Sequence, residues 1–408
     1  MGTAALLLGL AVIVVVCQLM AWLARRLGQP PVIGEIIGGI LLGPSLFGGH
    51  LTSALFPTDI RPMLSAFANI GVALFMFVMG MELDRAIVGK RIGRLGWLCT
   101  GSLAAPVGFG IVLANWLLHD HPSKHPAEFV ALMATAMAVT AFPVLARVIS
   151  DRGLLGTHIG GLALAVSAVG DVIAWSVLAV VVALTSSTSP WRLLLLAPYG
   201  LIMVFVVPRM LRTRLMARLD RRSALLVVVV GVVLSSAATE WMGLHLIFGA
   251  FLFGLVVPRD AGLGKLRREL GSSIQPLAQF LIPIYFAVAG LNVNLSHLDG
   301  AAGLQLVFIL LVAIGGKLLG VYAAARGAGL DHRSSAGLAS LMNIRGLTEL
   351  VLLTVGFQIG LLDGTLYSLM VVMAVVTTVM AGPLLRLSLG TAPATRPDVS
   401  PVQYQESR

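Results

Sequence analysis

One stretch of the chain decides its fold class: residues 156–186, GTHIGGLALAVSAVGDVIAWSVLAVVVALTS, where the acid Asp171 stands about halfway along an apolar run. About 20 predominantly apolar residues are enough to cross a hydrocarbon core of about 30 Å. The stretch is therefore predicted to be a membrane-spanning helix, and a rise of about 1.5 Å per residue places Asp171 near the middle of the membrane. A carboxylate at that depth is costly and by default functional.

Apolar runs of this kind recur along nearly the whole chain. Of its 408 residues, 58% are hydrophobic and only 11% are charged, against about 25% charged residues in soluble domains. We therefore predict an all-α polytopic membrane protein, with a transmembrane domain at 1–388 and a disordered cytoplasmic tail at 389–408. The thirteen expected spans are 4–24, 30–48, 63–83, 92–118, 128–150, 156–186, 191–208, 223–238, 243–257, 273–293, 302–325, 335–360 and 364–387.

The basic residues decide the expected orientation. A formal net charge of +10 would suggest a nucleic-acid partner for a soluble protein, but here Lys and Arg lie in short connections between apolar runs. They collect in every second connection, as the positive-inside rule requires of cytoplasmic loops. We therefore expect no nucleic-acid partner, and a plasma-membrane protein with its N-terminus outside and its C-terminus in the cytoplasm. The connections expected to face the cytoplasm carry Arg25, Arg26, Arg85, Lys90, Arg91, Arg147, Arg152, the run from Arg209 to Arg222, Arg259, Lys265, Arg267, Arg268, Arg326, Arg333, Arg386 and Arg396.

Two of the expected spans, 128–150 and 335–360, contain residues that weaken a helix near the middle. The first carries Pro143 in the sequence TAFP, and the second carries Gly346 in the sequence NIRG. Pro lacks a backbone donor and Gly lowers helix stability, so each span is expected to be interrupted there. The spans are seven apart in chain order and so cross in opposite directions, which is the pattern of inverted repeats whose broken helices meet at a midplane site. The alternative is a simple proline kink and a packing glycine.

Further charged residues are expected at membrane depth. Lys317 lies deep in its span, where a buried ammonium needs a partner, and Asp171 and Glu349 are the available acids. The alternative is a lysine that snorkels to the membrane surface. Arg345 and Glu349 are spaced i,i+4, so they would form an ion pair on a continuous helix. If the helix is interrupted, these two residues and Asn343 are expected to brace the break.

A carboxylate such as Asp171 can hold a proton or a cation, but not both. Competition for one group couples the two fluxes, so the sequence predicts a secondary transporter that exchanges protons for Na⁺ or K⁺. Two alternatives remain: a passive channel, although no TVGYG-like filter sequence is present, and an exporter of an organic metabolite, although aromatic residues are only 7%. No zinc-binding histidine pattern or nucleophile elbow supports an enzyme, and we expect neither a cofactor nor a structural metal.

Five motifs in the chain resemble those of one known family. In order they are QPPVIGE (29–35), GILLGPS (39–45), FMFVMGMEL (75–83), TAFPVLAR (140–147) and MNIRGLTEL (342–350). Together they resemble the cation:proton antiporter-2 branch of the sodium/proton exchanger superfamily. The last motif is particularly similar to the plant cation/proton exchangers and their bacterial relatives. The resemblance covers about residues 20–388.

This resemblance implies a fold with two crossed, unwound helices and a separate dimerisation panel, and hence a homodimer. It also implies that Asp171 and Thr140 bind the ion and the proton, and that Lys317 is the family's basic residue on the opposite segment. The chain departs from the family at Gly170, where an acidic or amide residue usually stands. With Asp171 as the single carboxylate, one proton is expected to exchange for one cation, which makes the exchange electroneutral.

Overall fold

The structure is a computed structural model, and it describes residues 2–44, 49–82, 92–154, 157–185, 194–213, 219–258, 264–295 and 300–389. Within these ranges the chain forms helices and turns without a β-strand, which confirms the all-α prediction. In the described part of the chain, eight helices are long and apolar enough to cross a membrane, and five shorter apolar helices accompany them. Apart from its first residue, the tail predicted at 389–408 lies outside the described residues.

Each expected span coincides with one helix or with a series of consecutive helices. The unbroken spans are α1 (Gly2–Arg26), α2 (Pro31–Leu42), α4 (Arg61–Glu82), α6 (Ile92–Leu117), α9 (His158–Thr185), α14 (Arg221–Trp241), α15 (Leu246–Val256), α16 (Gly264–Leu291), α17 (Gly300–Gly327) and α20 (Gly364–Leu389). The interrupted spans are α7 (Pro126–Ala138) with α8 (Phe142–Asp151), and α18 (His332–Met342) with α19 (Leu347–Gln358). The remaining span consists of α11 (Leu196–Leu201), the π-helical η2 (Ile202–Val206) and α12 (Val207–Leu211), and α3 (His50–Leu55) is a short connecting helix.

Two helix boundaries differ from the sequence prediction. The helix α2 stops at Leu42 and not at 48. Proline disfavours the helical conformation of the residue before it, and Gly43, which precedes Pro44, has an extended backbone. The helix α16 begins at Gly264 and not at 273, because the apolar pattern marks only the part of a helix that lies in the membrane. Its first turns are charged and continue the helix beyond that part.

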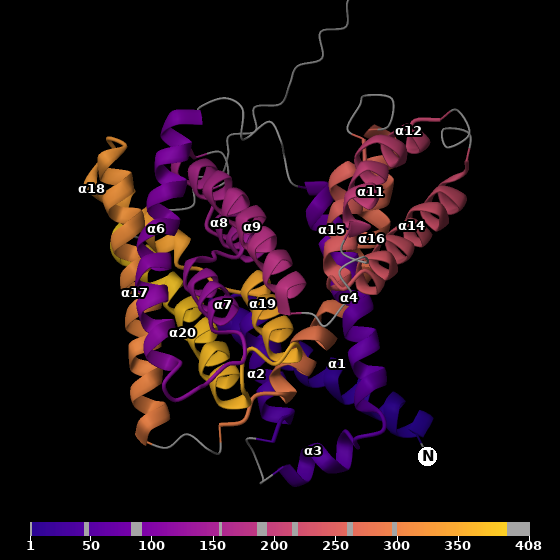
Figure 1. Cartoon of the computed structure of the whole chain (residues 1–408), viewed down its shortest axis with the longest axis horizontal. Helices are drawn as coiled ribbons and strands as arrows, with labels where there is room; N and C mark the ends of the chain where they lie inside the picture. Colours follow the sequence, from indigo (N-terminus) through magenta and orange to yellow (C-terminus); the bar gives the residue numbers. More distant parts are fainter. Residues whose placement is uncertain are drawn as a thin grey trace, which may run out of the picture.

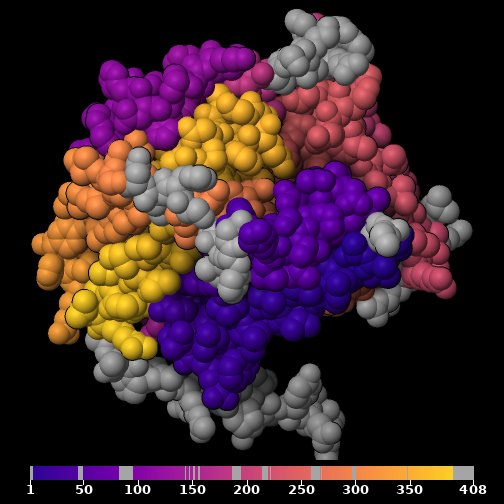
Figure 2. All heavy atoms as spheres, turned by 90° about the horizontal axis from the view of Figure 1, so that it is seen from below, coloured from indigo at the N-terminus to yellow at the C-terminus, as the bar shows by residue number. Residues whose placement is uncertain are grey.

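The helices form two groups that lie side by side (Figure 1). The scaffold group contains α1, α2, α4, α14, α15 and α16, and the broken-helix group contains α6–α9 and α17–α20. We call the face that carries α3 the lower face, as it lies in Figure 1, and the opposite face the upper face. Seen from below, the indigo and violet surface of the N-terminal helices borders both the yellow surface of the C-terminal helices and the salmon surface (Figure 2).

A close crossing of α4 and α15 holds the scaffold group together. A Cβ atom added at Gly80 would lie 2.2 Å from the carbonyl oxygen of Phe251, and one added at Gly254 would lie 2.1 Å from that of Phe77. No side chain fits at such distances, so glycine is required at both positions. In a lipid environment, where helix association depends on van der Waals packing, small residues let two backbones approach in this way.

A polar cluster at the lower face connects three parts of the broken-helix group. The ring of His121 lies 2.5 Å from Asp363 through Nδ1 and 3.1 Å from the Gln305 oxygen through Nε2. Gln305 also donates to the Asp120 carboxylate at 2.9 Å. The hydrogen bond to Asp363 raises the pKa of His121, so the ring keeps its charge over a wider pH range. The cluster ties the loop after α6 to the start of α17 and to the turn before α20.

Candidate functional site

The interruptions of the two broken spans lie against each other. The backbone N–H of Ala141 donates to the carbonyl oxygen of Ile344 at 3.1 Å, and the Thr140 hydroxyl donates to that of Met342 at 2.6 Å. The pair α7–α8 runs from the lower to the upper face, and α18–α19 runs in the opposite direction (Figure 1). The prediction of two crossed, unwound helices is therefore confirmed, and the alternative of a simple kink is wrong.

The two residues predicted to break these helices lie at the ends of the interruptions. The first interruption covers 139–141, and Pro143 is the second residue of α8. At that position the missing N–H of proline costs no helical hydrogen bond. Pro143 therefore lies in the first turn of α8, which is the second half of its span, and not in the interruption itself. Gly346 precedes α19 as its N-cap, and a Cβ atom there would lie 2.6 Å from Cγ2 of Val144.

Two cations bind the carbonyl end of α7, whose last carbonyl groups have no partner within the helix. The Arg345 guanidinium donates to the carbonyl oxygens of Ala136 and Met137, the latter at 2.6 Å. The Lys317 ammonium donates to the carbonyl oxygen of Ala138. Positive charge is favourable at this negative end of a helix dipole. The two side chains thus replace the hydrogen bonds that the interruption removes.

Lys317 differs from its expected surroundings. Its side chain is buried in protein, with 1% of the residue exposed, so it does not snorkel to the membrane surface. Besides Ala138, its ammonium contacts the carbonyl and hydroxyl oxygens of Ser102 at 3.1 and 3.3 Å. Among the described residues, neither Asp171 nor Glu349 comes within salt-bridge distance of it. Neutral oxygen acceptors take the place of the expected carboxylate partner.

Arg345 and Glu349 form the predicted i,i+4 pair although Arg345 lies in the interruption before α19. The distance between Arg345 Nη1 and Glu349 Oε1 is 3.7 Å, and both side chains are fully buried. Beyond this ion pair, the Glu349 carboxylate makes no hydrogen bond in the described part of the chain, and the buried Asn343 amide makes none either. Arg345 therefore connects α7 with α19, and its charge balances that of Glu349.

Asp171 lies beside both interruptions. Its Oδ2 accepts a hydrogen bond from the Thr348 hydroxyl at 3.3 Å, and the backbone N–H of Phe142, at the start of α8, is near enough to favour the charged carboxylate. Its Oδ1 is buried and has no hydrogen-bond partner among the described residues. One helical turn earlier, the Ser167 hydroxyl donates to the Thr140 carbonyl oxygen at 3.4 Å. The carboxylate thus faces the N-terminal ends of α8 and α19, which favour negative charge, and one of its oxygens is free.

The structure brings the predicted residues into one region, but their contacts were only partly foreseen. The side chain of Thr140 contacts Met342 and not Asp171, and only its carbonyl reaches α9, through Ser167. Serine and threonine are common in membrane helices, so residue type alone gave no signal for the polar residues that the sequence analysis missed. Ser167 lies four residues before Asp171 and Thr348 lies within the MNIRGLTEL motif, so their positions were a signal, whereas Ser102 and Thr378 are far in sequence from the site residues that they contact. The missed residues are Ser102, Ser167, Thr348 and Thr378.

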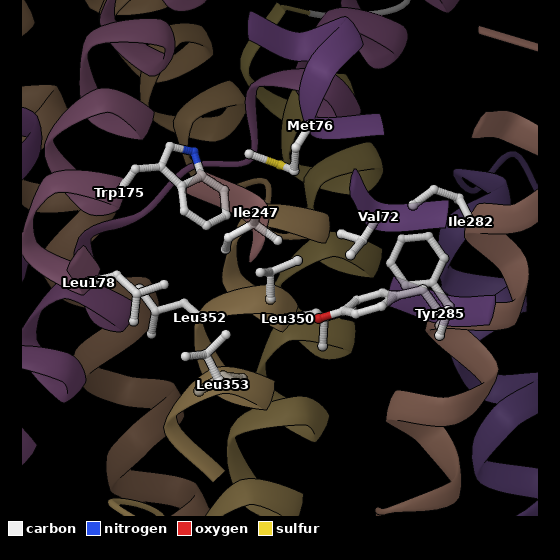
Figure 3. Close-up of a cluster of buried hydrophobic side chains, with 14 of the residues drawn as sticks. Val72, Met76, Trp175, Leu178, Ile247, Ile282, Tyr285, Leu350, Leu352 and Leu353 are labelled. Carbon is white, nitrogen blue, oxygen red and sulfur yellow. The ribbon is translucent and has the colours of Figure 1, made fainter. Parts of the chain in front are cut away.

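Apolar side chains fill the space between the two helix groups on the lower side of Asp171. Figure 3 shows side chains of α9 and α19 facing side chains of α4, α15 and α16. None of the labelled residues is more than 9% exposed. We call this cluster the apolar seal; its members on α9 and α19 lie between the level of Asp171 and the lower face. Its labelled members are Val72, Met76, Trp175, Leu178, Ile247, Ile282, Tyr285, Leu350, Leu352 and Leu353.

Comparison with known proteins shows the family to which the chain belongs. The family model described as sodium/hydrogen exchanger, transmembrane, matches residues 11–389, which is nearly the whole chain. The chain belongs to the sodium/hydrogen exchanger family. The exchanger resembles the Na⁺/H⁺ antiporter NhaS4 of Synechocystis, with 36% identity over 97% of this chain and 100% of that protein. It is 35% identical to the K⁺/H⁺ antiporter 1 of Saccharomyces cerevisiae, over 92% of this chain and 45% of that protein.

A solved structure shows the same fold. The sodium proton antiporter MjNhaP1 of Methanocaldococcus jannaschii superimposes on this exchanger with a TM-score of 0.69, over 96% of this chain and 98% of that one. The identity between the two sequences is only 16%. The similarity therefore concerns the arrangement of the helices, and it confirms the predicted antiporter fold.

Proposed function

We propose that this exchanger moves a monovalent cation and protons in opposite directions through one carboxylate, that of Asp171. Proton-coupled cation exchange is the class of activity of its family, and its relatives in Synechocystis and yeast are named Na⁺/H⁺ and K⁺/H⁺ antiporters. The chain is thus a secondary transporter embedded in a membrane. The observation that supports Asp171 is its buried Oδ1, which lies at the crossing of the two interruptions without a partner.

Coupling follows from the chemistry of a buried carboxylate. A carboxylate that has lost its water is stable only when another group neutralises it. A proton or a cation at Oδ1 of Asp171 does so, and after one has bound, no charge remains to hold the other. Each ion therefore leaves when the other arrives, and no separate coupling device is needed.

The apolar seal supports a specific conformational state. The seal fills the space between the two helix groups toward the lower face, so we infer that an ion reaches Asp171 from the side of the upper face. The described residues at that face include Arg25 and Arg26 at the end of α1, Arg326 at the end of α17 and Arg386 near the end of α20. By the positive-inside rule we assign the upper face to the cytoplasm. The structure then represents an inward-facing state, and transport requires the broken-helix group to move along the scaffold group until the seal opens.

The same orientation gives the positions of the two termini, and further assignments complete the proposal. The N-terminus lies outside, the C-terminus lies in the cytoplasm, and residues 1–388 act as one transport domain in the plasma membrane. Lys317, Arg345 and Glu349 brace the interruptions, with the two cations holding α7 in place, whereas the Asn343 side chain, predicted to act with them, makes no hydrogen bond among the described residues. The functional unit is a homodimer, as the family resemblance implies.

The exchange is expected to be electroneutral, because Gly170 leaves Asp171 as the single carboxylate on this part of α9. One net charge moved through 100 mV is worth about 2.3 kcal/mol, or about a fifty-fold bias of the equilibrium. In proteoliposomes whose voltage is clamped with a potassium gradient and valinomycin, sodium-driven proton flux should not respond to voltage. A membrane potential that drives exchange without an ion gradient would show that a second group titrates.

The Gly170→Asp variant provides the matched control. A Cβ atom at Gly170 would meet no other atom within 4 Å, and the residue lines a mainly apolar cavity of about 360 Å³ between α6, α7 and α9. A second carboxylate therefore fits beside Asp171, and exchange by this variant should become voltage-sensitive. The Gly170→Asn variant adds similar volume without a charge and should remain electroneutral.

A further inference from the structure

The hydroxyl group of Thr348 does not make the contact that several other threonines in the described helices make. Thr135, Thr185 and Thr377 each donate to the carbonyl oxygen four residues earlier, at 2.7 to 2.8 Å. This is the usual contact of a threonine inside a membrane helix. Thr348 donates instead to Oδ2 of Asp171, on another helix, at 3.3 Å.

The interruption of the span explains this difference. The residue four positions before Thr348 is Ile344, which lies in the interruption, and its carbonyl oxygen accepts the backbone N–H of Ala141. The Thr348 hydroxyl therefore has no helical acceptor in its usual direction. The residue is only 3% exposed, so no bulk water replaces that acceptor. The crossing of the two interruptions thus leaves one hydroxyl free to face Asp171.

A hydroxyl in this position suits both ions that the site must hold. It can donate its hydrogen to the charged carboxylate while its oxygen lone pairs remain available, and it can accept a hydrogen bond from a protonated carboxyl group. Proteins replace the hydration shell of a monovalent cation with oxygen ligands. The Thr348 oxygen stands next to the carboxylate whose Oδ1 has no partner, so the two residues offer oxygens from opposite helices.

We propose that Thr348 is a ligand of the transported cation and contributes to its selection, with its hydroxyl oxygen completing the coordination shell that Asp171 begins. The proposal rests on the assignment of Asp171 as the ion-binding carboxylate. The bound cation then joins α9 to the first turn of α19. The site is therefore complete only while the two helices keep the arrangement set by the crossed interruptions.

The test compares variants that keep or remove the hydroxyl. Thr348→Val keeps the shape of the side chain without the hydroxyl, and Thr348→Ser keeps the hydroxyl. In proteoliposomes at fixed pH, the valine variant should raise the apparent KM for the cation about tenfold, with a smaller change in kcat. The serine variant should stay within about threefold of wild type. The control is Thr354→Val on the same helix, whose hydroxyl lies 3.5 Å from that of Tyr367 and away from Asp171; its KM should not change.

Measurements with Li⁺, Na⁺, K⁺ and Rb⁺ distinguish a ligand from a structural residue. The loss of a ligand should change the ratios of KM between these cations in the valine variant, because each ion fits the oxygens differently. A change of kcat alone, or an equal change for all four cations, would overturn the proposal. The proposal would also be overturned if the valine and serine variants behave alike. It would equally be overturned if neither Thr348→Val nor Thr348→Ala folds, because the hydroxyl would then serve folding.

The Asp171→Asn variant separates this proposal from the proposed function. If Asp171→Asn retains exchange, the proposed function is wrong. If Asp171→Asn is inactive while Thr348→Val is normal, only the role of Thr348 is wrong.

Discussion

Asp171→Asn is expected to abolish cation-dependent proton exchange while the protein remains folded and inserted. The substitution keeps the shape of the side chain, and its amide oxygen can still accept the hydrogen bond from Thr348. It removes the negative charge that attracts a cation and the group that binds a proton, so both half-reactions are lost together. The measurement follows a pH dye in everted vesicles while sodium or potassium salt is added.

The matched control for this prediction is Asp331→Asn, the same chemical change at an exposed position. Asp331 is the N-cap of α18, where its side chain accepts the backbone N–H of Ser334 at 3.2 Å. Asparagine caps a helix about as well as aspartate, so the exchange activity and the amount of folded protein should match wild type. Cation-dependent proton flux that survives in Asp171→Asn would show that the assigned carboxylate does not carry the transported ions.

Arg345→Ala is expected to destabilise the protein by about 3–5 kcal/mol, the usual cost of removing one partner of a buried ion pair. The substitution leaves Glu349 buried without its counter-charge and leaves the carbonyl oxygens of Ala136 and Met137 without a donor. The measurement is the thermal unfolding of the detergent-solubilised protein, together with the yield of the monodisperse fraction. Exchange activity should fall in proportion, because Lys317 alone then holds the end of α7.

The double variant with Glu349→Gln shows whether the two residues act as a pair. Glu349→Gln removes the charge that Arg345 neutralises, so the double variant should be no less stable than the worse of the two single variants. Residues in contact show such non-additive effects, whereas independent residues show additive ones. Additive losses of stability would contradict the assignment of Arg345 and Glu349 as one bracing unit.

Most of the fold was predictable because a membrane limits what a sequence can form. An apolar run long enough to cross the hydrocarbon core has few options other than a helix, so all thirteen spans coincide with helical segments. Pro143 and Gly346 marked the interrupted spans, since both residues weaken a helix interior. The exact interruption at 139–141 was not predictable, because proline is also favourable at a helix start.

The contacts within the site were less predictable than its members. The position of Lys317 showed that the residue was special, but its acceptors are the carbonyl of Ala138 and the two oxygens of Ser102. Backbone acceptors of this kind leave no trace in a sequence, because every residue carries a carbonyl group. Thr348 was overlooked for a related reason. Its hydroxyl faces Asp171 only because Ile344 lies in the interruption, which is a property of the crossed backbones.

The central claim, that one carboxylate holds either the cation or the proton, is tested most directly by proton release on cation binding. The purified protein is placed in weakly buffered detergent solution, a sodium or potassium salt is added, and a pH indicator reports the protons released. Wild type should release about one proton for each cation bound at saturation, because Gly170 leaves no second carboxylate beside Asp171. Asp171→Asn should release none. Equal proton release by wild type and Asp171→Asn would contradict the account, because the exchanged proton would then come from another group.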